Sequence, residues 1–356
     1  MNGGKYDSQA GKATITLKSK KRAKEFFGAL AKASRIYELD ITFSWDWAKT
    51  DLEAFESALK KSNVSILRLE LGQFQESSSR KLLPTSTLYA ILTRTIEHSN
   101  MKAIHIVLFP DLNKPSNLQL KGLPYLHKLT IEMNSREIGP SELQALAKSL
   151  KINTALTTLD LRDSPIRGEG AHELLEALKD NETLTTMSLT GNLIGDEGAV
   201  TLSESLENNM TLISLQLDGN SIGDNGALAL SKALKVNTKL TTLKLGNNLI
   251  RDEGAQEMSE MLKSNNTLSA LHLDGNSIGD EGALALSVAL KANVTLTTLG
   301  LEGNSIGDEG VLALSEALKV NTTLTTLCLD GNLFEDEGAL KLLEVVKTKT
   351  KFNLIT

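Results

Sequence analysis

Cysteine and long apolar runs are almost absent from this 356-residue chain. Its one cysteine, Cys328, cannot form an internal disulfide, and the opening residues MNGGKYDSQAGK lack the apolar run of a signal peptide. We therefore expect a cytoplasmic protein. The basic stretch from Lys18 to Lys24 is either a nuclear-import signal or the solvated face of a helix. No stretch approaches the roughly 18 consecutive apolar residues of a membrane span, so no membrane partner is expected.

Positive charge is not in surplus either. The formal net charge is −6 and the isoelectric point is about 5.6. A general nucleic-acid-binding protein needs an excess of Lys and Arg to displace the counterions of the phosphates. We therefore expect no nucleic-acid partner.

A 28-residue repeat occupies the second half of the chain. The segment LTTLDLRDSPIRGEGAHELLEALKDNET begins at Leu156, and six related segments follow without a break in the period, the last from Leu324. Each opens with the pattern L-x-x-L-x-L or a close variant, and this alternation places apolar side chains on one face of a short strand. The second half of each segment contains a G-D-E-G-A-like start and then L-x-x-x-L spacing, which predicts a helix.

Polar residues recur at fixed positions of this repeat. Asparagine occupies the ninth position in six copies, and we expect its inward side chain to hydrogen-bond the backbone of the adjoining coil. The aspartate series from Asp196 to Asp336 is predicted to cap the helix that each member begins. The asparagine series from Asn181 to Asn321 is predicted to end each helix in the left-handed conformation.

Looser copies of the strand pattern precede the regular repeats. They begin at Ile36, Val64, Met101 and Leu126, at unequal intervals, so we count eleven coils in all. We therefore divide the chain into an N-terminal tail and capping strand–helix (1–35), irregular repeats (36–155), seven regular repeats (156–351) and a partial terminal repeat (352–356). The last begins at Phe352, one full period after the last regular start.

These coils, with L-x-x-L-x-L-x-x-N-x-I followed by G-D-E-G-A and a helix, resemble the ribonuclease-inhibitor-like branch of the leucine-rich repeats. The resemblance is specific over residues 156–348 and weaker over 36–155. It implies an α/β fold, a right-handed solenoid or horseshoe with a concave parallel β-sheet and convex α-helices. A strand and a helix of this size bury their apolar faces only when neighbouring coils stack, which agrees with that fold.

The same resemblance implies a protein-interaction module that binds its partner on the concave sheet and the adjoining loops. The branch includes ribonuclease inhibitor, Ran GTPase-activating proteins and the sensing domains of nucleotide-binding immune receptors. The chain lacks the cysteine-rich coils of the first, the acidic tail of the second and the G-x-x-x-x-G-K-[ST] loop of the third. A GTPase activator of Ran-regulator type, and an effector or inhibitor that captures a host enzyme, stay open as alternatives.

Candidate partner-binding residues are those that vary between coils and point away from the core. In the regular coils they are Asp160, Arg162, Gln216, Asp218, Lys244, His272, Asp274, Glu302, Cys328 and Asp330. The four acids from Asp218 onward form a stripe that favours a basic partner surface, or they are ordinary solvated charges. In the irregular coils the candidates are Arg68, Glu70, His105, Val107, Phe109 and Glu132. Val107 and Phe109 either emerge beside His105 or lie beneath the loop PDLNKPSNLQLKG.

No catalytic, metal or cofactor site is expected. His272, Asp274 and Cys328 have the residue types of a thiol triad, but Cys328 lies two coils from His272, about 10 Å along the sheet, too far for a thiol–imidazole hydrogen bond. The DGNSIGD runs resemble the start of a calcium loop, yet Ile222 and Ile278 occupy a position that needs an oxygen ligand. Five histidines and one cysteine show no zinc pattern.

Overall fold

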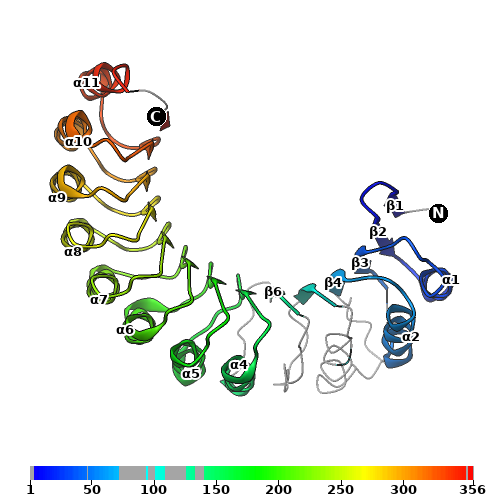
Figure 1. Cartoon of the computed structure of the whole chain (residues 1–356). Helices are drawn as coiled ribbons and strands as arrows, with labels where there is room; N and C mark the ends of the chain where they lie inside the picture. Colours follow the sequence, from blue (N-terminus) through cyan, green and yellow to red (C-terminus); the bar gives the residue numbers. More distant parts are fainter. Residues whose placement is uncertain are drawn as a thin grey trace, which may run out of the picture. The chain divides into compact units, whose positions relative to one another are not determined.

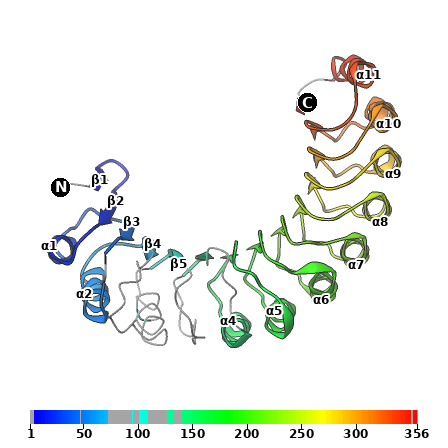
Figure 2. The ribbon, with the colours of Figure 1, turned by 180° about the vertical axis from the view of Figure 1, so that it is seen from behind.

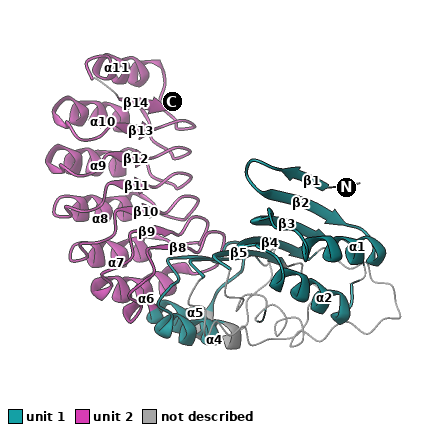
Figure 3. Ribbon diagram, turned by 45° about the vertical axis from the view of Figure 1, so that its right-hand side comes forward, with its two compact units in different colours: residues 1–177 teal, residues 178–356 magenta. Residues whose placement is uncertain are grey.

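The computed structural model describes residues 4–45, 47–71, 94, 101–108, 126–132, 140–349 and 352–355. The chain divides into two compact units, residues 1–177 and 178–356 (Figure 3). In each unit the strands lie side by side, and the helices cover one face of them (Figures 1 and 2). The predicted α/β arrangement of stacked strand–helix coils is therefore confirmed within each unit. Within the described ranges, no helix has the length and apolar character that a bilayer crossing requires.

The first unit opens with a hairpin that the sequence analysis missed. Strand β1 (Gly4–Asp7) runs antiparallel to β2 (Lys12–Leu17), and Gly11 in the turn has a φ of 64°. Parallel strands follow in chain order, namely β3 (Glu38–Phe43), β4 (Ile66–Leu71), β5 (Ala103–Leu108), β6 (Lys128–Glu132) and β7 (Thr158–Asp160). The described helices are α1 (Lys20–Leu30), α2 (Lys49–Lys60), α4 (Pro140–Ile152) and α5 (Gly168–Glu176), and a short 3-10 helix, Ala177–Lys179, comes next.

The second unit repeats one plan six times. Its parallel strands are β8 (Thr186–Ser188), β9 (Ser214–Gln216), β10 (Thr242–Lys244), β11 (Ala270–His272), β12 (Thr298–Gly300), β13 (Thr326–Cys328) and β14 (Asn353–Ile355). The alternating helices are α6 (Gly195–Asn208), α7 (Asp224–Leu234), α8 (Asp252–Leu262), α9 (Asp280–Ala292), α10 (Asp308–Val320) and α11 (Asp336–Val346).

The repeated leucines form the core, as predicted. Leu240, Leu243 and Leu245 are each 0% exposed, and the same positions are buried in the other regular coils. Near the N-terminus, aromatic rings replace them beneath β3. The ring centroids of Phe27, Phe43 and Phe55 lie 5.4–6.0 Å apart. Stacking thus hides the apolar face that one strand and one helix cannot bury alone.

The predicted register is correct in the irregular coils and wrong by one residue at the last strand. Leu39, Leu67, Ile104, Leu129 and Leu159 pair in succession, which reproduces the unequal intervals expected for these coils. At the other end Leu327 pairs with Leu354. The final interval is therefore one residue shorter than the repeat, and Phe352 is not the equivalent of Leu324.

The inward asparagines bridge neighbouring coils, as predicted. The Oδ1 atom of Asn248 accepts hydrogen bonds from the backbone N–H groups of Asn220 (2.9 Å) and Ile222 (3.0 Å), and its Nδ2 donates to the Leu217 carbonyl (3.0 Å). One and two coils further on, Asn276 and Asn304 likewise each accept an isoleucine N–H and donate to a leucine carbonyl. Buried turn amides thus find partners in the next coil.

The aspartates cap helices, but not the ones predicted. The Oδ1 atom of Asp224 accepts from the N–H groups of Arg251 (2.8 Å) and Gly254 (2.9 Å), which belong to the start of α8 rather than α7. The equivalent aspartates at 196, 252, 280 and 308 act in the same way. A Cβ atom at Gly254 would lie 2.6 Å from this oxygen, which accounts for the second glycine of G-D-E-G.

The asparagines predicted to end the helices also differ from the prediction. Asn293 ends α9 in an extended conformation, with φ −73° and ψ 132°, and not in the left-handed region. Its Nδ2 donates to the carbonyl of Leu262 (2.8 Å), in the last turn of the preceding helix, while Oδ1 accepts from the N–H of Leu296 (2.7 Å). The asparagine therefore completes the helix of the previous coil, and its side-chain bonds take the place of the expected left-handed turn.

Candidate functional site

The candidate site is the strand face, meaning the side of each sheet opposite the helices. In the second unit, strand register places Gln216, Lys244, His272, Gly300 and Cys328 in one row across five neighbouring strands. Adjacent members of such a row are about 4.8 Å apart. The four side chains in this row are half-buried, so each one offers part of its surface to solvent. The predicted alignment of these residues is therefore confirmed, and their role in binding stays a prediction.

The acidic stripe beside this row has two kinds of member. Asp218 and Asp274 are half-buried, and each accepts a backbone N–H bond from the next coil, from Gly246 (3.0 Å) and Glu302 (3.1 Å) respectively. Glu302 and Asp330 are exposed. Two carboxylates of the stripe thus support the scaffold, and the other two are exposed to solvent.

The thiol beside the stripe is not activated. Burial raises the pKa of Cys328, and the carboxylates of Asp274 and Glu302 raise it further. His272 Nδ1 lies 3.3 Å from Asp274 Oδ2, but Gly300 separates His272 from Cys328 in the row. A nucleophilic cysteine needs a lowered pKa and a base within hydrogen-bond reach. The geometry of these residues therefore lacks both requirements of a thiol catalyst.

On the strand face of the first unit, charged side chains pair across strands. Arg68 donates from Nη1 to Asp40 (3.2 Å) and to Glu70 (2.9 Å), and His105 Nε2 lies 3.3 Å from Glu132 Oε2. Sequence reasoning missed Asp40, although the 28-residue spacing between Asp40 and Arg68 already places them in one row. The candidates in these coils thus belong to a paired network rather than being separate charges.

The same network shifts the protonation of its histidine. Burial lowers the pKa of His105 below its usual value, and the positive charges of Arg68 and Arg162 lower it further. The hydrogen bond and the negative charge of Glu132 act in the opposite direction. The neutral imidazole is therefore the favoured form at neutral pH.

Two predicted surface residues are covered. Val107 is 3% exposed, although register places it between Glu70 and Glu132 in a row of the strand face. Asp160 is 5% exposed because Arg162 folds back over it, with Nε 3.0 Å from Oδ2. Strand alternation correctly gives the direction of these side chains but not what lies above them.

The remaining candidate in this region, Phe109, lies outside the described residues, as does the loop that was considered as a cover for it. Across the ranges that the structure describes, no group of three or more His, Cys, Asp or Glu side chains is arranged to hold a metal ion.

Comparison with known proteins identifies the repeat. A family model described as "Leucine Rich repeat" matches residues 153–175, 180–203, 208–231, 236–259, 264–287, 292–315 and 320–343. A search of curated proteins found no match.

Solved structures were also compared with the chain, and the internalin match over nearly the whole chain agrees with the fold. An internalin from Listeria monocytogenes has a TM-score of 0.51 and 18% sequence identity, over 98% of this chain and 87% of the internalin. Leiomodin-1 actin-binding site 2 has a TM-score of 0.36 and 26% identity, over 41% of this chain and 85% of its own. The C-terminal domain of tropomodulin from Caenorhabditis elegans has a TM-score of 0.37 and 14% identity, over 43% and 91%. With seven matched segments and parallel strand–helix coils in both units, the chain is a leucine-rich-repeat protein.

Proposed function

We propose that this leucine-rich-repeat protein binds a protein partner on its strand face, without catalysing a reaction on it. Leucine-rich repeats serve in general as protein-interaction modules. The observation that carries the proposal is the row Gln216, Lys244, His272, Gly300 and Cys328, in which the side chain changes at every coil while the core leucines beneath it do not. A varied surface on a constant scaffold is what selective recognition requires.

The charge of the strand face in the second unit indicates the kind of partner. Glu302 and Asp330 are exposed, and the half-buried Asp218 and Asp274 add negative charge beside them. Complementary charge raises the association rate and orients the two proteins. We therefore propose a partner with a basic surface, and we assign the repeats to the ribonuclease-inhibitor-like branch on their 28-residue length and G-D-E-G-A motif. We also propose a cytoplasmic location, in which the free Cys328 stays reduced.

A capture experiment tests the strand face. The full chain is compared with a triple variant, Lys244→Glu, Glu302→Lys and Asp330→Lys, in affinity capture followed by mass spectrometry. A matched control makes the same kinds of charge change on exposed helix positions of the same unit, namely Glu197→Lys, Lys232→Glu and Glu253→Lys. We expect a protein that the wild type and the control retain and the strand-face variant loses. Equal retention by all three proteins would contradict the proposal.

The wild type and the strand-face variant also distinguish passive binding from activation of a GTPase. Added to GTP-loaded small GTPases, a passive binding module leaves the hydrolysis rate unchanged. Acceleration by the wild type that the strand-face variant lacks would replace passive binding with GTPase activation. Stoichiometric inhibition of a captured enzyme would instead indicate an inhibitor.

A further inference from the structure

We propose a second binding surface in the second unit, on the outer side of α9, α10 and α11, which docks a basic amphipathic helix of a partner protein. Its centre is one position of the repeat, occupied by Leu284, Leu312 and Leu340 on three consecutive helices, and we call this the helix-face row. The surface lies opposite the strand face, so the inference does not depend on the function proposed above.

The helix-face row exposes apolar surface that folding leaves uncovered. Leu284 is 54% exposed, Leu340 is 62% exposed, and Leu312 between them is half-buried. Helix α10 contacts both α9 and α11, so the three leucines lie on neighbouring helices. Val288, 46% exposed, extends it at a position where the five other coils of this unit carry Glu or Lys. Single exposed leucines are common, but a contiguous apolar patch bordered by charge is typical of a docking surface.

Carboxylates border this row on the side of the helix starts. Glu281, Glu309 and Glu337 are exposed, and each precedes a leucine of the row by three positions, which puts the two side chains on one helix face. Among the described residues, these three carboxylates make no ion pair. They therefore remain available for the lysines or arginines of a partner.

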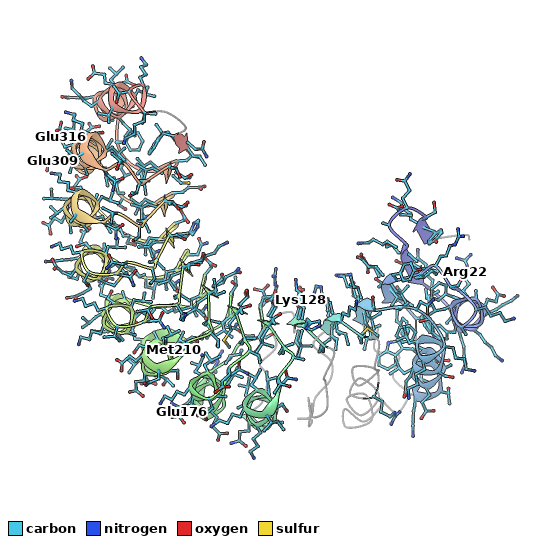
Figure 4. The ribbon with its side chains drawn as sticks, in the orientation of Figure 1. Arg22, Lys128, Glu176, Met210, Glu309 and Glu316 are labelled. Carbon is cyan, nitrogen blue, oxygen red and sulfur yellow. The ribbon has the colours of Figure 1, made fainter. Side chains whose placement is uncertain are left out.

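On the other border, Glu316 and Glu344 follow the leucines by four positions and pair with Lys319 and Lys341. Figure 4 shows Glu309 and Glu316 on the outer side of α10. The arrangement is thus an apolar strip with carboxylates outside any ion pair along one border and Glu–Lys ion pairs along the other. Such a strip attracts a basic protein segment and repels nucleic acid and anionic lipid, whose phosphates carry the same sign of charge.

The distance between the leucines of the row favours a helix as the bound segment. Packed helices lie about 8–10 Å apart, so the three leucines recur at about that interval. A helix rises 1.5 Å per residue, and residues seven positions apart are therefore about 10.5 Å apart on one face. In an extended strand, about 10 Å corresponds to three residues, which point to opposite faces. A helix with one apolar residue per heptad and basic residues beside it therefore matches the row.

A designed peptide tests this directly. The probe is a fluorescein-labelled helix of three heptads, with leucine at one position of each heptad and lysines on both sides, and binding to the full chain is followed by anisotropy. We expect saturable binding that weakens with added salt. The double variant Leu284→Glu and Leu312→Glu should weaken it by about tenfold or more, because it removes the apolar contact and adds charge at its centre.

Two controls test for charge attraction alone and for self-association. Leu249→Glu alters an equally exposed leucine, 59%, in the turn before α8, and should leave the affinity unchanged. Binding equal to that of a scrambled peptide of the same composition, or equal loss in Leu249→Glu, would overturn the proposal. So would self-association in analytical ultracentrifugation that the double variant abolishes, since the occupant would then be a second copy. The strand-face triple variant should bind the peptide normally, so failure here leaves the function proposed above untouched.

Discussion

The carboxylate of Asp274 occupies the space that a side chain at Gly300 would need. A Cβ atom at Gly300 would lie 2.5 Å from both carboxylate oxygens of Asp274, which lies in the preceding coil. Asp274 also accepts the N–H of Glu302, so it joins the turns that follow two neighbouring strands. Any side chain at position 300 would therefore have to displace the Asp274 carboxylate.

The first prediction follows from this contact. Gly300→Ala should push the Asp274 carboxylate away from the Glu302 amide and lower the free energy of unfolding by about 0.5–1.5 kcal/mol, the usual contribution of one hydrogen bond. Denaturant unfolding measures the change. Gly28→Ala is the control, since no atom of the described residues lies within 4 Å of a Cβ there, and in helix α1 it should stabilise by about 0.5–1 kcal/mol. A neutral Gly300→Ala would show that Asp274 moves without loss.

Two asparagines at the same repeat position should differ in importance. Asn248 Oδ1 accepts two backbone amides, whereas the buried Oδ1 of Asn220 has no hydrogen-bond partner in the described part of the chain. Asn248→Ala leaves two buried N–H groups unsatisfied and should destabilise by about 1–3 kcal/mol more than Asn220→Ala. Urea unfolding of both variants checks the difference. Equal losses would mean that the amide donors, which both residues have, dominate.

Two aspartates distinguish the stability that comes from capping the next helix from the stability that comes from the dipole of the aspartate's own helix. Asp224 and Asp336 both begin their own helices, so each interacts with the dipole of that helix. Asp224 also caps α8, while Asp336 is exposed and caps no following helix among the described residues. Asp224→Ala should therefore cost about 0.5–2 kcal/mol more than Asp336→Ala. Thermal and urea unfolding test this, and equal effects would assign the aspartate to its own helix.

Acid should weaken the first unit through His105. Its pKa is lower in the folded chain than in the unfolded chain, so below the unfolded value the unfolded chain takes up the proton first. Stability is thus fully present above the ordinary histidine pKa of about 6.5 and is lost as the pH falls towards the folded value. Unfolding measured across this range should show the loss, and His105→Gln should remove part of it. An unchanged slope in that variant would assign the loss to other groups.

The thiol of Cys328 should report the neighbouring charge. Burial and the carboxylates of Asp274 and Glu302 raise its pKa, so Glu302→Gln should lower the pKa and speed the reaction with a disulfide reagent at mildly alkaline pH. Asp330→Asn is the matched control, because Asp330 is not among the groups that shift this thiol. Equal acceleration in both variants would indicate a general field and not a local contact.

Much of the fold follows from the repeat period. Apolar residues that recur with the 28-residue period must stack to be buried, and within the second unit this requirement predicts the strand register from Met187 to Leu327. The period cannot predict which coil supplies the backbone groups that a polar side chain binds. Asp224 begins its own helix in sequence, yet the amides that it binds belong to the next coil and come near only after stacking. The hairpin of β1 lies outside the repeat and gives no periodic signal.

The candidate site is predicted less completely. Alternation along the strands gives the direction of Gln216, Lys244 and His272, because successive side chains point to opposite faces. It does not give what covers a residue, as Val107 and Asp160 show. Nor does it reveal the helix-face row, since exposed leucines that recur once per repeat look the same as core leucines until the helix orientation is known.

The caps of each helix come from neighbouring coils, so adjoining coils stabilise each other's helix ends. The start of α8 depends on Asp224 from the coil before it, and the end of α8 depends on Asn293 from the coil after it. If an interior coil unfolds, the helices of the coils on both sides therefore each lose the capping hydrogen bonds at one end. Local unfolding should therefore involve several neighbouring coils at once. Unfolding that begins in the middle of the second unit should involve more coils than unfolding that begins at its edge.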